Sequence, residues 1–338
     1  MANPILVDVT REPLTESFHR GAVAIADATG TIRAGLGDIE ATIYPRSALK
    51  PIQALPLVES GAAEAFGLDD EEIALACASH SGEPMHTTRI AAWLKRIGCT
   101  ESDLACGPHP AIYELVSAAM IARGETPTRI HNNCSGKHAG FLTVARHLSL
   151  PIAGYEMHDH PVQKMVAATL ADLAGIDRDM PWGVDGCAVP NFALPLSAFA
   201  RALAGMADPS RLSAPRADAA RRIVRAMTAH PEFVSGTGRV CAILMRAGRG
   251  RFAVKTGAEG VYAGIVPERG LGIALKIDDG ASRASQTAIA ALLEKMGLIH
   301  GDDAAHALAH APVTNTRDMV VGERRPAAAL EELTLEQL

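Results

Sequence analysis

Hydrophobic and polar positions change their spacing twice along the chain. Near the N-terminus the short apolar run Pro4–Val9 predicts a strand, and Phe18–Ile25 and Thr31–Gly37 flank the turn Asp27–Gly30 as the arms of a hairpin. From about residue 50 to about residue 175 the spacing becomes helical. The helices predicted there and shortly afterwards are Thr87–Ile97, Ile112–Arg123, Pro161–Ala174 and Pro215–Ala229, while Glu71–Cys77 fits either a strand or a helix.

Strand character returns after about residue 240, and an amphipathic helix, Ala281–Leu298, follows it. The short apolar runs predicted to be strands are Val240–Met245, Arg251–Lys255, Val261–Ile265 and Gly272–Ile277. A hairpin near one end of the chain and strands near the other can close into one antiparallel sheet. The sequence therefore predicts an α+β fold (α/β in the broad sense), with an antiparallel sheet flanked by helices and a separate helical lobe.

The same pattern predicts the organisation of domains. A discontinuous sheet-containing domain is expected over residues 1–48 and 185–325, and a mainly helical lobe over residues 49–184. Residues 326–338, rich in Ala and Glu, are expected to form a tail with a loosely docked helix. A cleft between the two lobes is the expected place for a binding site.

Composition narrows the function classes. The chain has 338 residues, 48% of them hydrophobic, which is ample for a buried core. The net charge is −6 and no long basic run occurs, so we expect no nucleic-acid partner. The apolar segments are too short to span a membrane, and the N-terminus lacks the pattern of a signal peptide. Six scattered cysteines suit a reducing compartment, so a cytoplasmic location is expected.

The strongest chemical signal is the run from His131 to Gly140, in which turn-forming pairs bracket Cys134 and Lys137. A thiolate is a zinc ligand, and an amine ligates when it is neutral. A second thiol, Cys187, lies in a similar tight setting. Any single cysteine can equally be a small buried hydrophobe, which is the favoured interpretation of Cys77, Cys99, Cys106 and Cys241. His158 and His160 could also bind metal, although a loop before a helix is the preferred interpretation.

A serine–lysine hydrolase is indicated by two further motifs. Ser47 and Lys50 form an S-x-x-K pair, and Lys255 begins a K-T-G sequence at the end of a predicted strand. This combination is typical of penicillin-binding proteins and serine β-lactamases. Pro51 disfavours a plain helix at Lys50, so either a 3₁₀ turn carries Ser47 to Lys50 or a helix begins with Pro51. The alternative is a serine at a helix start beside a solvated lysine.

The polar cluster Ser79–Pro84 follows an apolar segment and therefore lies where site residues often occur. Its alternative role is to cap the following helix, and the two roles are compatible.

These motifs resemble those of the rhizobial-type L-asparaginases, the asparaginase II family. The resemblance runs from the first strand to about Gly280, and His131–His138 is its most specific block. The other matching blocks are Arg46–Pro51, Cys77–Glu83, Asp185–Cys187, Gly236–Arg239 and Lys255–Gly260.

The resemblance implies a fold similar to serine β-lactamases and glutaminases, and hydrolysis of L-asparagine to L-aspartate and ammonia. It implies two catalytic tandems, Ser47 with Lys50 and Ser79 with Lys255. It also implies a homodimer, and one Zn²⁺ per chain near water and Asp185, and because lysine is an unusual zinc ligand we expect partial occupancy. The implied zinc ligands are Cys134, Lys137 and Cys187.

Ser47 is the expected nucleophile, with Lys50 as its base, and Ser79 with Lys255 is expected to relay a proton or contribute to the attack. Lys276 is the alternative partner for Ser79. Lys255 is preferred because it begins the K-T-G sequence. Arg46 and Arg239 are candidates to bind the substrate carboxylate. The other residues expected to contact substrate are His80, Asn133, Asp185 and Glu259, and His80 and His138 could instead support metal ligands.

Two other function classes stay open. One is a different serine–lysine hydrolase, acting on glutamine, a peptide or a β-lactam, although the lack of an export signal counts against cell-wall peptides. The other is a zinc-binding module without enzymatic activity.

Overall fold

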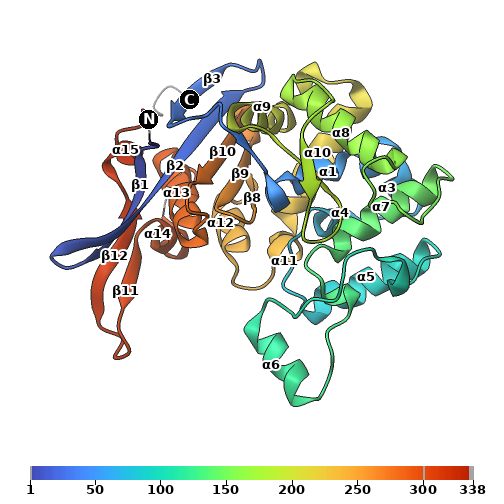
Figure 1. Cartoon of the computed structure of the whole chain (residues 1–338), viewed down its shortest axis with the longest axis horizontal. Helices are drawn as coiled ribbons and strands as arrows, with labels where there is room; N and C mark the ends of the chain where they lie inside the picture. Colours follow the sequence, from blue (N-terminus) through green and yellow to red (C-terminus); the bar gives the residue numbers. More distant parts are fainter. Residues whose placement is uncertain (1, 300, 335–338) are drawn as a thin grey trace.

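The computed structural model describes residues 2–299 and 301–334. Eight strands of this part of the chain form one antiparallel sheet in the order β11-β12-β1-β2-β10-β9-β8, and β3 also pairs with β2 (Figure 1). The predicted hairpin and C-terminal strands thus meet in one sheet. The strands are β1 (Ile5–Arg11), β2 (Leu14–Asp27), β3 (Ile32–Leu36), β8 (Ala253–Thr256), β9 (Val261–Val266), β10 (Leu271–Ile277), β11 (Ala311–Thr314) and β12 (Val320–Pro326).

The long strand β2 joins the two halves of this sheet. Its first half pairs with β1, and its second half pairs with β3 and β10. Five consecutive residues, Ala22 to Ala26, are at most 3% exposed, so this half of the strand is covered on both faces. Two small two-stranded sheets lie apart from it, β4 (Thr42–Ile43) with β7 (Leu194–Pro195) and β5 (Trp182–Val184) with β6 (Pro190–Phe192).

Helices pack on the sheet. Helix α9 (Leu196–Ala207) packs on β2, β9 and β10, and α13 (Ser282–Lys295) packs on β1, β9, β10 and β12. Gly272 allows the closest of these approaches, because a Cβ there would lie 2.3 Å from the carbonyl oxygen of Ala200 in α9. Helix α14 (Asp303–Ala309) packs on α13, and the short α15 (Ala328–Glu331) packs on β1.

Whereas α11 and α12 lie near the centre of Figure 1, most of the remaining helices gather on its right. There α4 packs on α5, α7 and α10, and α2 packs on α7, α8 and α10. The helices are α1 (Lys50–Gln53), α2 (Leu55–Glu59), α3 (Ala62–Ala65), α4 (Asp70–Ala76), α5 (Pro84–Arg96), α6 (Glu114–Ala122), α7 (Ser135–His147), α8 (Pro161–Ala174), α10 (Ala214–Ala229), α11 (Pro231–Ser235) and α12 (Val240–Gly248). Single 3₁₀ turns are η1 (Arg46–Leu49), η2 (Glu101–Asp103), η3 (Arg129–His131), η4 (Pro209–Arg211) and η5 (Pro267–Arg269).

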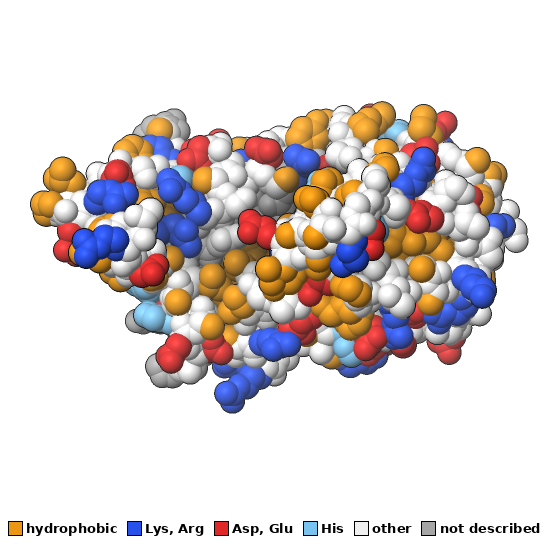
Figure 2. Space-filling model, turned by 90° about the horizontal axis from the view of Figure 1, so that it is seen from below, with side chains coloured by type: hydrophobic (Ala, Val, Ile, Leu, Met, Phe, Trp, Pro, Cys, Tyr) orange, Lys and Arg blue, Asp and Glu red, His pale blue; other side chains and the backbone are white. Residues whose placement is uncertain are grey.

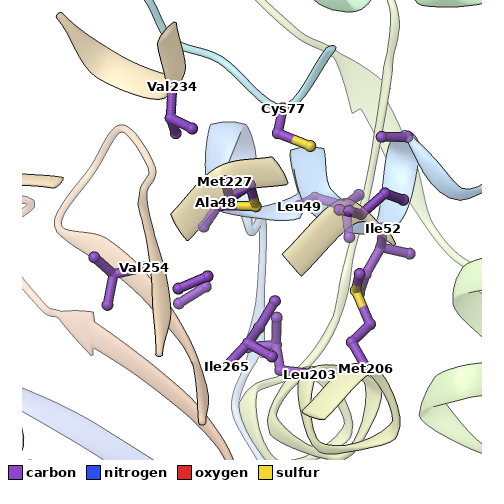
Figure 3. Packing of buried hydrophobic residues seen from close by; sticks show 14 of the residues in the cluster. Ala48, Leu49, Ile52, Cys77, Leu203, Met206, Met227, Val234, Val254 and Ile265 are labelled. Carbon is purple, nitrogen blue, oxygen red and sulfur yellow. The ribbon is translucent and has the colours of Figure 1, made fainter. Parts of the chain in front are cut away.

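One continuous hydrophobic core connects the sheet and the helices. Figure 3 shows side chains from η1 and α1, including Ala48, Leu49 and Ile52, meeting Val254 and Ile265 of the sheet together with residues of α9 and α10. Ala48, Leu49 and Ile52 are fully buried. Because these side chains are packed in the core, they fix the position of the backbone turn that carries Ser47 and Lys50.

The mixed fold with an antiparallel sheet is confirmed, but individual elements differ from the predictions. Val240–Met245 belongs to helix α12, so its prediction as a strand is wrong. Its buried residues Cys241, Leu244, Met245 and Gly248 follow helical spacing, and a short apolar run cannot by itself distinguish this from a strand. The ambiguous segment Glu71–Cys77 forms α4, which begins with a capping box at Asp69.

The C-terminal part of the chain also holds a hairpin, β11–β12, that the sequence did not predict. The division into domains stays a prediction; α10, from the segment assigned to the sheet domain, packs on α2 and α4. Within the expected tail, β12 extends to Pro326 and α15 follows, whereas residues 335–338 lie outside the described residues.

Charged side chains of both signs are interspersed on the face shown in Figure 2. At its left end, where β11, β12 and the β1–β2 turn project in Figure 1, hydrophobic side chains are exposed beside Lys and Arg. They include Leu14, Phe18, Met319 and Val320. Among the described residues, no helix combines the length and the apolar character that crossing a bilayer requires.

Candidate active site

The hydroxyl of Ser79 lies between two buried lysines. Lys255 Nζ is 2.8 Å from Ser79 Oγ, and Lys50 Nζ is 3.1 Å from the same oxygen. Lys50 begins α1, Ser79 follows α4, and Lys255 lies on β8, so three distant segments of the chain meet here. The Ser79 backbone N–H donates to the carbonyl oxygen of Val234 at 2.9 Å, which fixes the loop after α4 against α11.

The two lysines have different surroundings. Lys50 Nζ also donates to the carbonyl oxygens of Ala78 and, at 3.5 Å, of Asn133. With Ser79 these acceptors match the three protons of an ammonium group. Burial lowers the pKa of Lys255 to about 7, and the charge of Lys50 acts in the same direction. Lys255 is therefore the lysine suited to be neutral near pH 7 and to accept a proton from Ser79.

Ser47 lies in the 3₁₀ turn η1, and α1 follows with Pro51 in its first turn, so both conformations considered from the sequence occur. The Lys50 backbone N–H donates to the carbonyl oxygen of Ser47. The two side chains do not form the expected pair, because Lys50 Nζ contacts Ser79 instead. Among the described residues, the Ser47 hydroxyl has no hydrogen-bond partner, and Ser47 lines the same cavity as Ser79.

Gly257 brings β8 close to this turn. A Cβ at Gly257 would lie 2.6 Å from the carbonyl oxygen of Pro45, so only glycine permits the approach. The K-T-G sequence therefore has two structural uses, with Lys255 directed at Ser79 and Gly257 against the turn of Ser47.

A cavity of 430 Å³ contains both serines. Sequence reasoning missed two of its residues, Cys241 and Tyr262, whose Sγ and Oη atoms are 3.1 Å apart. Burial raises the pKa of the Tyr262 phenol well above its usual value. Tyr262 lies on a predicted strand and Cys241 in a run misread as one, so nothing in their local sequence shows that they face a cavity. The other lining residues are Asn133, Ser235, Gly238, Arg239, Val240, Thr256, Gly257, Ala258, Ser282 and Gln286.

Arg239 is the arginine that lines this cavity. Its guanidinium has no hydrogen bond or ion pair within residues 2–299 and 301–334. The loop before it is held by Glu83, which accepts from the backbone N–H of Thr237 at 2.9 Å and from its hydroxyl at 2.7 Å. Glu83 also accepts from Ser81 at 2.5 Å. These bonds keep the pKa of Glu83 below its usual value although burial opposes them.

The other predicted carboxylate clamp, Arg46, is already paired. Its Nε donates to Asp185 Oδ1 at 2.8 Å, and neither residue is among those that line the cavity of the two serines. Arg46 lines a neighbouring 470 Å³ cavity together with Glu259 and Lys276. Lys276 Nζ donates to the carbonyl oxygens of Glu259 at 2.8 Å and of Ile277 at 2.5 Å rather than to Ser79. The geometry therefore favours Lys255 over Lys276 as the partner of Ser79.

The three expected zinc ligands come together beside this region. Lys137 Nζ donates to Cys187 Sγ at 2.9 Å, and the Cys134 thiol hydrogen-bonds to Cys187. All three residues are at most 4% exposed. Cys134 lies at the start of α7, which approaches α4 so closely that a Cβ at Gly136 would be 2.3 Å from the carbonyl oxygen of Leu75. This contact sets the cluster next to the loop of Ser79.

The protonation states of the cluster fit a thiolate site. The hydrogen bond from Cys134 and the charge of Lys137 lower the pKa of Cys187 well below its usual value, despite burial. The hydrogen bond of Cys134 with Cys187 raises the pKa of Cys134 to about 12, and burial is the second cause of this increase. The nearby thiolate charge raises the pKa of Lys137, against the effect of burial. A thiolate, a thiol and an amine converging in this way provide a donor set suited to zinc once Cys134 and Lys137 lose their protons.

His80 and Asn133 lie beside the cluster and the cavity. His80 is fully buried, its Nδ1 accepts from the Gly82 backbone N–H at 3.2 Å, and its Nε2 therefore donates to Ser135 Oγ at 2.9 Å. Burial lowers its pKa well below the usual value, so it is neutral. His80 lines neither cavity described above. Asn133 lines the cavity of the serines, and its Oδ1 lies 3.2 Å from Cys134 Sγ, as an alternative acceptor for the one proton of that thiol.

His138 follows Cys134 by four residues and lies in α7. Its Nδ1 is 2.6 Å from the hydroxyl of Tyr155, and its Nε2 is buried without a hydrogen-bond partner in the described structure. Burial lowers its pKa to about 3, so the ring is neutral. His138 is therefore not among the residues that line the cavity of the serines.

The chain is similar to one protein family and to several solved structures. A family model described as L-asparaginase II matches residues 7–326. No curated protein matches the chain significantly. Among solved structures, Mglu in its native form at 4.3 M NaCl is 18% identical with a TM-score of 0.46, over 88% of this chain and 66% of its own, so the chain spans about two thirds of that protein. A β-lactamase from Mycobacterium bovis is 14% identical with a TM-score of 0.40, over 78% of this chain and 89% of its own.

Proposed function

The chain belongs to the L-asparaginase II family, and from this premise we propose that it hydrolyses L-asparagine to L-aspartate and ammonia by serine–lysine catalysis. Family membership supports an amidohydrolase, and the particular amide is our proposal. The observation that carries the catalytic part is the position of Ser79 Oγ, 2.8 Å from Lys255 and 3.1 Å from Lys50, in a cavity that also contains Ser47.

The arrangement supports a division of roles between the serines. Ser47 has an unbonded hydroxyl in the cavity and is free to attack the amide carbon, whereas Ser79 is already bonded to both amines. In this proposal the Ser47 hydroxyl, which has no hydrogen bond to Ser79 in the described residues, first moves to Ser79, and its proton then passes through Ser79 to neutral Lys255. Lys50 stays protonated and stabilises the negative charge that develops on the serine oxygens.

The proposed reaction has two steps, acylation of Ser47 and hydrolysis of the ester. The Ser47 oxygen bonds to the amide carbon, the C–N bond breaks, and the leaving nitrogen takes the proton held by Lys255 to depart as ammonia. A water molecule then attacks the resulting ester, passes a proton back to Ser47, and releases aspartate. Attack by Ser79 itself is the alternative route, because its hydroxyl touches the candidate base directly.

Substrate recognition is assigned to the charged groups at the edge of the cavity. Arg239 has a guanidinium without a protein partner in the described residues, and a guanidinium suits a carboxylate. Arg46 and Asp185 satisfy each other at 2.8 Å, so they would have to separate before either could bind substrate. Arg239 is therefore the proposed partner of the substrate's α-carboxylate. Asn133, in the same cavity, is a further proposed contact.

We also propose that Cys134, Lys137 and Cys187 hold one zinc ion. Bound there, zinc would supply a fixed positive charge next to the pocket. Contacts among the chain's own residues fix the surrounding segments. The two cysteines connect α7 with the Asp185 loop, and Asp185 accepts a hydrogen bond from Arg46. A homodimer and a cytoplasmic location are kept as proposals, to be tested by light scattering and cell fractionation.

The decisive experiment measures ammonia release by the purified protein from L-asparagine and L-glutamine, and follows ring opening of a β-lactam by its change in absorbance. Hydrolysis of asparagine that is lost in both Ser47→Ala and Ser79→Ala, while both variants keep the wild-type melting temperature, supports the proposal. A preference for glutamine or the β-lactam would assign the same site to a different amide. Bound zinc without turnover of any substrate would favour a binding module.

A further inference from the structure

A second group of metal-type ligands lies in the C-terminal part of the described chain, far in sequence from the cysteines. His306 lies on α14 and His310 caps its C-terminus, four residues later, so both extend from one side of the helix. Glu294, near the end of α13, faces them. His306 Nδ1 is 2.7 Å from Glu294 Oε1, and His310 Nε2 is 3.9 Å from Glu294 Oε2. One donor atom from each residue lies within 4.8 Å of the other two.

These separations match those of ligands around one ion. Two atoms that are each about 2.1 Å from a tetrahedral zinc ion lie about 3.4 Å apart. The separations of 2.7 and 3.9 Å in the cluster bracket this value. Because a carboxylate only accepts, His306 Nδ1 carries the proton in this 2.7 Å contact, so binding an ion requires that proton to leave as well as small side-chain adjustments.

A fourth residue gives His310 the orientation of a metal ligand. His310 Nδ1 is 3.0 Å from Glu323 Oε1 on β12, and a carboxylate can only accept there, so Nδ1 carries the proton. The other nitrogen, Nε2, then directs a lone pair toward Glu294. A carboxylate that holds one histidine nitrogen while the other binds metal is the usual arrangement in protein metal sites. A lone pair of His310 that faces Glu294 Oε2 at 3.9 Å leaves room for a cation between them.

We propose that Glu294, His306 and His310 bind a divalent transition metal of the zinc class, and that Glu323 orients His310. Two imidazoles with one carboxylate suit Zn²⁺, Co²⁺, Ni²⁺ or Cu²⁺, whereas Mg²⁺ and Ca²⁺ prefer oxygen ligands alone. His306 is 57% and Glu294 32% exposed, so an ion can enter from solvent and keep water as its remaining ligand. The bound ion would tie α13 to α14 and, through Glu323, to β12.

The site is independent of the proposed asparaginase activity and of the cysteine cluster, and cobalt distinguishes the two metal sites. Co²⁺ bound to thiolates gives a charge-transfer absorption band, whereas Co²⁺ bound to nitrogen and oxygen gives only weak ligand-field bands. Metal-free full-length protein is titrated with Co²⁺, and binding is followed both by calorimetry and by absorption. We expect a binding event without the charge-transfer band.

Three variants decide the outcome. His306→Ala and His310→Ala should each weaken the band-free binding event at least tenfold and leave the thiolate band unchanged. Cys187→Ser should remove the thiolate band and leave the band-free binding event unchanged. His109→Ala, which removes another exposed histidine, is the matched control and should change neither. Melting curves confirm that each variant is folded, and the increase in melting temperature on adding Co²⁺ should shrink in the two α14 variants. A band-free event of unchanged affinity in both, or no such event in the wild type, overturns the proposal.

Discussion

Glu83 and Thr237 join two loops that both reach the cavity. The carboxylate of Glu83 accepts from the Thr237 backbone N–H at 2.9 Å and from its hydroxyl at 2.7 Å. Ser79 precedes Glu83 by four residues, and Arg239 follows Thr237 by two. The position of the proposed carboxylate-binding arginine relative to the catalytic serine is therefore set by a contact between residues 154 positions apart.

Replacing Thr237 with Val tests this contact. The change removes the hydroxyl bond to Glu83 but keeps the backbone bond, so we expect a loss of about 1 kcal/mol in stability. Because Arg239 loses its fixed position, KM for asparagine should rise about tenfold while kcat falls less. Thr228→Val is the matched control, since its hydroxyl bonds only within α10. An unchanged KM in Thr237→Val would show that the loop does not position a substrate contact.

The rate of hydrolysis should depend on the protonation of Lys255. Its pKa is lowered to about 7, and only the neutral amine accepts a proton, so kcat/KM should rise with pH and level off above about 7. Lys255→Arg keeps a cation that stays protonated, and activity should fall by more than a hundredfold at every pH. Lys276→Arg should keep the midpoint of the wild-type profile, because Lys276 does not contact Ser79. A profile that is flat from pH 5 to 9 would exclude Lys255 as the base.

The same shift predicts how stability depends on pH. Lys255 loses its proton near pH 7 in the folded protein but only near 10.5 when unfolded, so between these values the unfolded state binds more protons. The contribution of Lys255 to the free energy of unfolding should therefore be most unfavourable below pH 7 and should improve as the pH rises. Denaturant titrations of Lys255→Met and wild type should differ most at pH 6 and converge toward pH 10. A difference independent of pH would contradict the lowered pKa.

Ser47→Ala should abolish hydrolysis while leaving the fold intact. The Ser47 hydroxyl makes no bond in the described structure, so its loss should change stability by less than about 0.5 kcal/mol. Loss of the attacking oxygen should lower the rate by several orders of magnitude. Mass spectrometry of rapidly quenched wild type should find the acyl group on the peptide containing Ser47. Residual activity above a tenth of wild type, about 1.4 kcal/mol in barrier, or an acyl group on Ser79, would reassign the nucleophile.

Cys187→Ser should remove zinc and weaken substrate binding more than it slows the chemical step. Two thiolates put negative charge on the metal and make bound water a poor acid, and a serine nucleophile is already available. Metal analysis and kinetics on the same sample should show lost zinc, raised KM and a surviving kcat. Cys99→Ala is the control, because this buried thiol lies outside the cluster. Lost zinc with complete loss of kcat in a folded variant would indicate a metal-activated hydroxide instead.

The sequence alone determined the types of chemistry and most of the strands. Pro4–Val9, Phe18–Ile25, Val261–Ile265 and Gly272–Ile277 contribute strands to one sheet, because short apolar runs bounded by Gly-rich turns are local properties. The motif blocks also predicted that Ser79 and Lys255 belong together, and they lie 2.8 Å apart. Local signals failed at Val240–Met245, where a short apolar run fits two periods, and at β11–β12, whose residues are mostly exposed or half-buried and form no apolar run.

Only the tertiary structure decided which side chain meets which. A motif places Lys50 three residues after Ser47, yet the course of the chain between α1 and α4 directs its amine to Ser79. Arg46 and Arg239 are chemically equivalent in the sequence, but Asp185 pairs with one and leaves the other in the cavity. The lowered pKa of Lys255 likewise follows from burial beside a second cation contributed by a different segment. Such long-range contacts depend on how the core closes, and no local pattern records them.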